Sequence, residues 1–328
     1  VPAGGEEVLM ANNKVLFRIQ RFDPEKDEKP HDQDFEIEVA PGATILKTLH
    51  RIRAEQDPTL ALRYSCGSAI CGSCAMKVNG HAILACKTQV SECVRDGMVR
   101  IAPVGNLKIL RDLVVDLEPF WESLGKVKPY LMPAGAAPDK ERPQTPDQFG
   151  SIDPSTTCIL CGACYSDCNV LEVDSTFLGP ASLAKAHRFI FDSRDANDQP
   201  RLREISERTG VWDCTHCGEC STRCPTETKP LERIEEIRVQ AMADEHHGNA
   251  GARHALGFRE SVGKNGLLNE NWLAVRSVGF FNLPGLISIM PVGLRMMMRG
   301  KMPPLIPHKI DKVDEVKKIF ARFEELRK

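Results

Sequence analysis

Residues 158–168 read CILCGACYSDC and residues 214–225 read CTHCGECSTRCP, so the same cysteine spacing occurs twice in this chain. In each motif three cysteines stand three residues apart, and a fourth follows four residues later. This spacing is typical of loops that hold [4Fe–4S] cubanes through thiolates, with the last cysteine of each motif ligating the cluster of the other. The sequence therefore predicts two cubanes with crossed ligands. The first would bind Cys158, Cys161, Cys164 and Cys224, and the second Cys168, Cys214, Cys217 and Cys220.

Zinc is the alternative for these eight cysteines, because they could also form two closed tetrahedral sites. Zinc ligands usually come as separated C-x2-C pairs, whereas each motif here contains an unbroken triplet of cysteines. The spacing therefore favours the cubanes.

A second cysteine pattern lies closer to the N-terminus, where Cys66, Cys71 and Cys74 follow the spacing C-x4-C-x2-C and Cys86 stands twelve residues further on. This is the plant-type [2Fe–2S] pattern, and a disulfide or zinc site is the alternative. Glycines and serines at 67, 68, 72 and 73 suit a tight loop whose backbone N–H groups point at the cluster. The remaining Cys93 is expected to be an ordinary buried or half-buried thiol.

The composition describes an ordinary protein of 328 residues, long enough for two domains, with 42% hydrophobic and 27% charged residues. The net charge of −2 gives no indication that the chain binds nucleic acid or an anionic membrane. Thirteen cysteines at these spacings indicate metal binding in a reducing compartment. Residues 1–13 lack the features of a secretory signal, and prolines and Arg295 interrupt the apolar stretch 278–298, so we expect no transmembrane span.

The remaining patterns predict the elements around the cysteines. Strands are expected at 14–22, 34–40 and 98–102, a hairpin turning at Asn79-Gly80, and helices after Thr44, at 110–124, within 180–208, from Pro230 to Ala243 and at the C-terminus. Five prolines in 133–157 predict a linker that is not helical. We therefore expect an α+β chain. Its parts are a plant-type ferredoxin (β-grasp) [2Fe–2S] domain at 14–132, the linker, an all-α dicluster ferredoxin domain at 158–245 and a helical extension at 246–328 that docks a partner.

This arrangement resembles the iron–sulfur subunit of succinate dehydrogenases and fumarate reductases. The resemblance covers about residues 14–245 and rests on the [2Fe–2S] cysteines, RDLVVD at 111–116, CILCGAC at 158–164 and Cys224-Pro225. It implies an electron-transfer subunit of a respiratory and tricarboxylic-acid-cycle oxidoreductase, with no catalytic residue of its own. A partner flavoprotein would oxidise succinate at its FAD, and electrons would pass through the three clusters to quinone.

Two positions depart from the common pattern of that family. Its members usually lack a cysteine at the position of Cys217, which leaves a [3Fe–4S] cluster on the residues that match Cys168, Cys214 and Cys220. With Cys217 present, we predict a second [4Fe–4S] cluster. Cys168 is followed by Asn169, Val170 and Leu171, where the family has a proline and tryptophans near the quinone. With the long extension, this resembles a less common branch whose partner is a cysteine-rich subunit of the heterodisulfide-reductase type.

The resemblance thus leads to a relay between FAD and a quinone-reactive, membrane-associated subunit, on the cytoplasmic side of the cell membrane and held there through partner subunits. A thiol-linked fumarate reductase or heterodisulfide-reductase-type complex is the alternative. The least favoured alternative is a structural protein that is held together by metal and has no redox function. His216, inside the second cubane motif, is a candidate for tuning the adjacent cluster or relaying protons.

Overall fold

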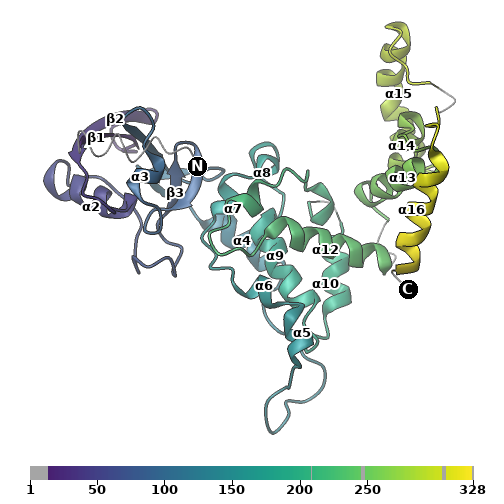
Figure 1. The fold of residues 1–328 in the computed structure, drawn as a ribbon, viewed down its shortest axis with the longest axis horizontal. Coiled ribbons are helices and arrows are strands. Elements are labelled where there is room, and N and C mark those ends of the chain that lie inside the picture. The colour runs from purple at the N-terminus through teal and green to yellow at the C-terminus, as the bar shows by residue number, and fades with distance from the viewer. Residues whose placement is uncertain (1–13, 208, 245–247, 305–307, 327–328) are drawn as a thin grey trace. The chain divides into compact units, whose positions relative to one another are not determined.

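The computed structural model describes residues 14–207, 209–244, 248–304 and 308–326 (Figure 1). The expectation about residues 1–13 falls outside this part of the chain. Two compact units are present, the first made of Val1–Ile205 with Thr209–Ile237 and the second of Ser206–Arg208 with Arg238–Lys328. All twelve predicted cluster ligands lie in the first unit.

A five-stranded mixed sheet forms the N-terminal part of the first unit. Its strands are β1 (Lys14–Arg21), β2 (His31–Glu38), β3 (Ala75–Val78), β4 (His81–Leu84) and β5 (Met98–Ala102). Their order in the sheet is β2-β1-β5-β3-β4. The first and last strands in sequence, β1 and β5, pair in parallel, and the other pairs are antiparallel. This is the β-grasp arrangement expected from the sequence.

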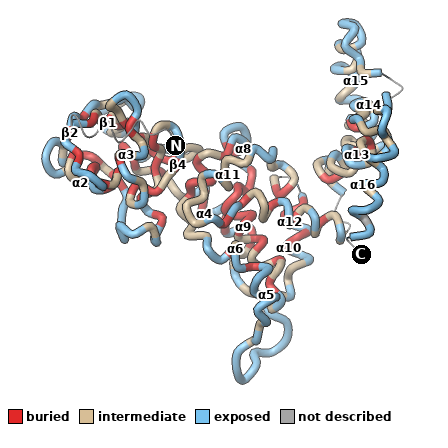
Figure 2. Tube along the Cα trace, viewed as in Figure 1, coloured by how far each residue is buried: buried red, intermediate tan, exposed pale blue. Residues whose placement is uncertain are grey.

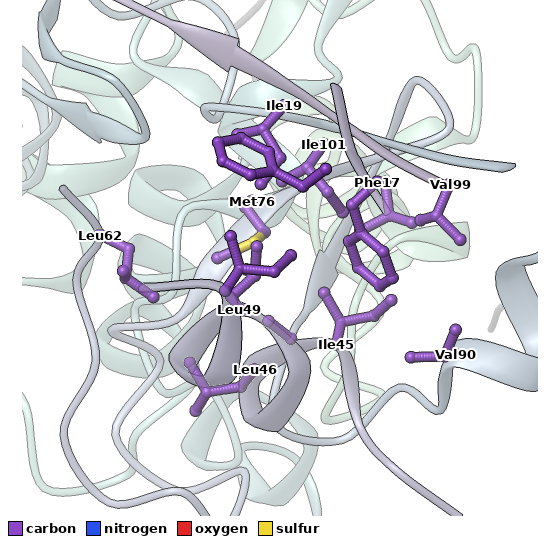
Figure 3. Packing of buried hydrophobic residues seen from close by; sticks show 14 of the residues in the cluster. Phe17, Ile19, Ile45, Leu46, Leu49, Leu62, Met76, Val90, Val99 and Ile101 are labelled. Carbon is purple, nitrogen blue, oxygen red and sulfur yellow. The ribbon is translucent and has the colours of Figure 1, made fainter. Parts of the chain in front are cut away.

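Helix α2 (Ile45–Glu55) covers this sheet and closes its core. Thr44 caps the helix as predicted, because its hydroxyl accepts a hydrogen bond from the backbone N–H of Lys47 at 3.2 Å. The predicted apolar face of α2 is buried and packs toward Phe17 and Ile19 of β1 (Figure 3). Its members are Ile45, Leu46, Leu49 and Ile52. The period-two pattern of β1 and the helical pattern of α2 thus meet in one hydrophobic core.

The predicted hairpin between Cys74 and Cys86 is present as β3 and β4. Asn79 and Gly80 form its turn with φ of 50° and 86°. Positive φ at both central residues is what a two-residue type I′ turn requires, and asparagine and glycine accept it most readily. The turn therefore fixes the register that returns Cys86 to the other three cysteines.

The helix predicted over 110–124 is wrong in its first half. Residues 109–115 instead form a small hairpin of β6 (Ile109–Arg111) and β7 (Val114–Val115), and a helix, α4, begins only at Glu118 and ends at Lys126. The apolar residues had the spacing of a helix, but tertiary hydrogen bonds override it.

Asp112 is the residue that holds this hairpin in place. Its side chain is buried, and its backbone is left-handed with a φ of 46°. The carboxylate accepts hydrogen bonds from Arg21 Nε at 2.9 Å and from the backbone N–H groups of Phe22 and Ala61 at 3.0 and 2.8 Å. A buried carboxylate needs such partners, and a helix through Asp112 would not reach them.

The rest of the first unit is helical around a largely buried central helix, α9 (Gly179–Ile190). The other elements are α5 (Pro146–Gly150), α6 (Asp153–Thr156), α7 (Ala163–Ser166), α8 (Asn169–Val173), α10 (Asp198–Ile205), η1 (Val211–Asp213), α11 (Glu219–Thr222) and α12 (Pro230–Ala243). The predicted helical patterning in 180–208 corresponds to α9 and α10, and the helix from Pro230 to Ala243 is confirmed as α12. Helices α5 and α6 correct the expectation that 133–157 contains no helix. Each carries a proline in its first turn, where the missing N–H costs nothing.

The second unit contains the end of α12, from Arg238 on, and four complete helices within its described residues. These are α13 (Ala250–Asn265), α14 (Glu270–Val278), α15 (Leu283–Met298) and α16 (Val313–Leu326). The predicted C-terminal helix is α16, which packs against α13 where Phe320 meets Gly263. Within the described ranges, none of the helices combines the length and apolar character needed to cross a membrane.

Candidate metal centres

The loop from Cys66 to Cys74 is folded so that its backbone N–H groups face thiol sulfurs. The N–H groups of Ser68, Ile70 and Cys71 donate to Cys66 Sγ at 3.3–3.4 Å, and that of Ala69 donates to Cys86 Sγ at 3.2 Å. Residues 67, 69 and 72 have φ between 57° and 73°, which turns successive amides inward. Such a nest of donors stabilises negative charge on sulfur.

The thiols of this loop also shift one another's pKa values. Hydrogen bonds from the Ser73 hydroxyl and from backbone N–H groups lower the pKa of the exposed Cys71 to about 6. Burial, together with the neighbouring Cys86 and Cys71, raises the pKa of Cys74 to about 12. The structure therefore gathers Cys66, Cys71, Cys74 and Cys86 at one place, and this donor set with its amide nest fits a [2Fe–2S] cluster.

One apolar cavity gathers the four cysteines predicted for the first cubane. Cys158, Cys161 and Cys164 from the first motif and Cys224 from the second all line it. Ala181 and Ala184 of α9, Ile159, Leu160 and Pro225 are among the other lining residues. The crossed contribution of Cys224 is the arrangement that the spacing predicts. An enclosure lined by four thiols and apolar side chains fits a cubane.

Burial dominates the thiol chemistry of this cavity. It raises the pKa of Cys161 to about 11 and, with the surrounding thiols, that of Cys164 well above the usual value. Cys224 differs. Burial raises the pKa of its thiol, but hydrogen bonds from Thr226 and Thr228 outweigh this and lower the pKa overall. Without a metal the site thus disfavours four thiolates, so metal binding must supply their deprotonation.

The four cysteines predicted for the second cubane also converge. Burial and the neighbouring Cys214 and Cys217 raise the pKa of Cys168. Burial and the same two cysteines, with Cys168, raise the pKa of Cys220 to about 12. Cys217 is thus one of the group, although its side chain is exposed while Cys168 and Cys220 are buried. Cys93 lies elsewhere, half-buried against the core of the sheet, as expected for a plain thiol.

The two cubane motifs share the same backbone conformation. In the first, Leu160 and Gly162 flank Cys161 with φ of 55° and 77°. In the second, His216 and Gly218 flank Cys217 with φ of 58° and 83°. The candidate His216 therefore occupies the position of Leu160 in a repeated loop. Its Nδ1 lies 3.9 Å from Glu235 Oε1, and its side chain is 42% exposed.

The three sites are neighbours in space, as the expected passage of electrons through three clusters requires. A Cβ placed on Gly72, in the [2Fe–2S] loop, would lie 2.8 Å from the Cβ of Cys161, so the two ligand loops touch. Cys71 and Cys161 line a common cavity. Cys164 in turn has its pKa raised by Cys220 of the second cubane site. The sites therefore form a row, with the first cubane in the middle.

Asn106 joins the sheet to the helical part beside the third site. Its side-chain amide donates to the carbonyls of Tyr165 and Cys168 at 2.8 and 2.9 Å. Lys87 Nζ donates to the carbonyl of Pro225 at 3.0 Å on the other motif. These contacts fix both cubane motifs to the sheet. No sequence pattern marked either residue.

Two family models match the chain. A 2Fe-2S iron–sulfur cluster binding domain matches residues 16–122, and a 4Fe-4S dicluster domain matches residues 154–228. The first therefore spans the sheet and the loop of Cys66. The second spans both cubane motifs.

Several curated proteins are similar to the chain over most of their own length. The succinate dehydrogenase iron–sulfur subunit of Coxiella burnetii is 39% identical over 237 residues, which is 71% of this chain and 100% of that protein. The fumarate reductase iron–sulfur subunit of Haemophilus influenzae is 38% identical over 72% of this chain and 96% of that protein. The 8-methylmenaquinol:fumarate reductase iron–sulfur subunit of Wolinella succinogenes is 36% identical over 302 residues, 89% of this chain and 92% of that protein.

A solved structure supports the fold. A chain of the Mycobacterium smegmatis Sdh1 complex superposes with a TM-score of 0.67 at 24% identity, covering 73% of this chain and 99% of that one.

Proposed function

The chain belongs to the family of iron–sulfur subunits of succinate dehydrogenase and fumarate reductase, and from this we propose that it relays single electrons between the FAD of a partner flavoprotein and a quinone-reactive, membrane-associated subunit. It is an electron-transfer component of an oxidoreductase, and the dicarboxylate chemistry belongs to the partner. The observation that carries the proposal is the row of three cysteine sites, because a relay requires neighbouring centres.

The residues of this chain would set the reduction potential of the cluster at each site. Clusters held by these thiolates supply one-electron redox chemistry. The backbone N–H groups that donate hydrogen bonds to Cys66 Sγ and Cys86 Sγ stabilise added negative charge and raise the reduction potential of the [2Fe–2S] cluster. The apolar lining around Cys164 opposes added charge and lowers the potential of the first cubane. A high-potential centre would thus adjoin a low-potential one.

We propose that the third site holds a [4Fe–4S] cluster on Cys168, Cys214, Cys217 and Cys220. The influence of Cys217 on the pKa values of both Cys168 and Cys220 supports this assignment. A [3Fe–4S] cluster on Cys168, Cys214 and Cys220 is the alternative. EPR of the protein as isolated distinguishes the two, because an oxidised three-iron centre is paramagnetic and an oxidised [4Fe–4S] centre of this type is not.

The partners we propose are a flavoprotein and a membrane-associated subunit at the cytoplasmic face of the cell membrane. The second would be a cysteine-rich subunit of the heterodisulfide-reductase type. The match to the Wolinella protein supports a shared branch, because an alignment over 89% of this chain must include much of residues 246–328. That relative's name points to a quinol. A thiol endpoint is the second candidate, favoured by the cysteine-rich partner, and assays of the purified complex with a quinone analogue and with dithiols separate the two.

The relay is tested with the chain and its flavoprotein together. Iron, acid-labile sulfide and zinc are first measured, since a zinc-loaded, colourless chain would refute the redox function. The clusters are then reduced with dithionite under anaerobic conditions, and fumarate is added. We expect fumarate to abolish the EPR signals of the reduced clusters in the complex but not in the isolated chain. Persistence of the signals in the complex would rule out electron exchange with the flavin.

A further inference from the structure

Helix α15 carries large apolar side chains around its whole circumference, and none of its residues is buried. Figure 2 shows it in the colours of exposed and half-buried residues. Its most exposed apolar residues are Leu283, Ile287, Met290, Leu294, Met297 and Met298, each more than half exposed. Phe281, just before the helix, is 98% exposed. A helix that is apolar on all sides is normally found inside a protein or in lipid.

The charged residues that flank this helix along the chain are of one sign. Residues 271–310 contain five lysines and arginines and no aspartate or glutamate, although the chain has 45 acidic residues and a net charge of −2. The five are Arg276, Arg295, Arg299, Lys301 and Lys309. Arg276 pairs with Glu260, whereas Arg295 lies in the last turn of α15 and Arg299 and Lys301 follow directly after the helix. The net charge of the whole chain therefore conceals a cationic, apolar segment.

We propose that α15 docks this chain directly on an anionic lipid surface. Its 16 residues span about 24 Å at the usual rise, less than the hydrocarbon core of a bilayer, so the helix would lie in the interface. Its apolar side chains would enter the acyl boundary, and Arg295, Arg299 and Lys301 would reach the phosphate headgroups. Charge complementarity favours lipid over a protein groove, because anionic headgroups neutralise a whole cationic segment without a specific acidic partner.

Another helix of the second unit provides a matched control. Helix α16 also exposes apolar side chains, with Ile319 and Phe323 67% and 61% exposed. Its neighbours are charges of both signs, such as the pair of Asp314 and Lys317 at 2.9 Å. Equal apolar exposure without a cationic field should not produce lipid binding that depends on anionic headgroups.

The test is co-sedimentation of the cluster-loaded full chain with vesicles of phosphatidylcholine alone or mixed with phosphatidylglycerol. We expect binding to the anionic vesicles that weakens with salt. The double variant Ile287→Glu/Leu294→Glu should bind at least about ten-fold more weakly, whereas Ile319→Glu/Phe323→Glu should bind like the wild type. Replacing Arg295, Arg299 and Lys301 by glutamine should cost up to about five-fold per residue on anionic vesicles only.

Two further measurements separate loss of lipid binding from misfolding of a variant and from loss of its electron-transfer function. Cluster absorbance and far-ultraviolet circular dichroism must match the wild type in each variant. A Phe281→Trp variant should shift its added emission to the blue on anionic vesicles. No vesicle binding, or equal binding by the α15 double variant, would overturn the proposal. So would loss of a partner subunit in that variant with vesicle binding unchanged, because α15 would then be a protein-docking helix.

Discussion

Replacing Gly72 by alanine should loosen the contact between the [2Fe–2S] loop and the first cubane motif. The added Cβ would lie 2.8 Å from Cys161 Cβ, 2.9 Å from Cys161 Cα and 3.1 Å from the carbonyl oxygen of Ile159. Two of these three atoms belong to the backbone, so no side-chain rotation relieves the clash. Gly72 also has a φ of 73°, which costs alanine conformational energy.

The size of the effect can be worked from these two contributions. The left-handed conformation costs alanine about 1–2 kcal/mol, and overpacking at a rigid contact typically costs about 1–3 kcal/mol. We therefore expect Gly72→Ala to lower the free energy of unfolding by about 2–5 kcal/mol. Gly42 is the matched control, because its φ is 71° and nothing lies within 4 Å of an added Cβ. Gly42→Ala should lose only the conformational contribution, about 1–2 kcal/mol.

The assay is thermal unfolding of the cluster-loaded chain, followed by the visible circular dichroism of the clusters. The difference between the two variants should be roughly 2–4 °C for each kcal/mol of extra destabilisation. A second readout is the EPR spin–spin interaction between the reduced [2Fe–2S] cluster and the first cubane, which should weaken in Gly72→Ala and not in Gly42→Ala. Equal melting temperatures and unchanged spin coupling would show that the two loops do not touch as described.

Three further predictions concern other parts of the first unit. Cys217→Ala should convert the third site to a three-iron centre with lower iron content, an EPR signal in the oxidised state and a higher reduction potential; an unchanged potential and spectrum would mean that Cys217 is not a ligand. Asp112→Asn should destabilise the chain by about 1–3 kcal/mol, because it removes one of the two carboxylates that neutralise the buried Arg21 and leaves only the pair with Asp57. The exposed Asp34→Asn, paired with Arg18, serves as the control in denaturant titrations and should change little. Burial and Arg233 lower the pKa of His187 to about 3, and burial raises the pKa of Glu236, whose Oε2 lies 2.5 Å from His187 Nε2. Between about pH 6.5 and that lowered value, only the unfolded chain gains a proton at His187. The free energy of unfolding should therefore fall between pH 7 and 5, with a shallower slope in His187→Gln, and equal slopes would contradict this.

Local signals were sufficient for the elements that the cluster sites depend on. Thr44 and the apolar positions after it predicted α2, and Asn79-Gly80 predicted the hairpin, because both depend on residues close in sequence. The cysteine spacings likewise led to the thiol groups that the structure gathers, including the crossed Cys224. Their ligation of clusters, and the domain limits at 132, 157 and 245, stay predictions.

What the sequence could not indicate depends on partners distant along the chain. The failed helix over 110–124 had the correct apolar spacing, but Asp112 is bound by groups about 50 and 90 residues away. The sequence explains Gly72 only as part of a tight loop around the [2Fe–2S] cluster, and the structure adds that Cys161 leaves no room for a side chain there. Asn106 belongs to no motif, yet its side-chain amide donates a hydrogen bond to the carbonyl of Cys168. In each case a tertiary contact decides the role of the residue.

The repeated left-handed bends around Cys161 and Cys217 have a consequence for electrochemical design. Because both loops share these bends, a difference in reduction potential between the two cubanes has to come from their side chains and from their contact with solvent, which is greater at Cys217 than at Cys164. Leu160 in one loop and His216 in the other occupy equivalent points in these bends. Exchanging the two side chains should change the reduction potential of one cubane relative to the other, while the ligands and the order of the clusters stay the same.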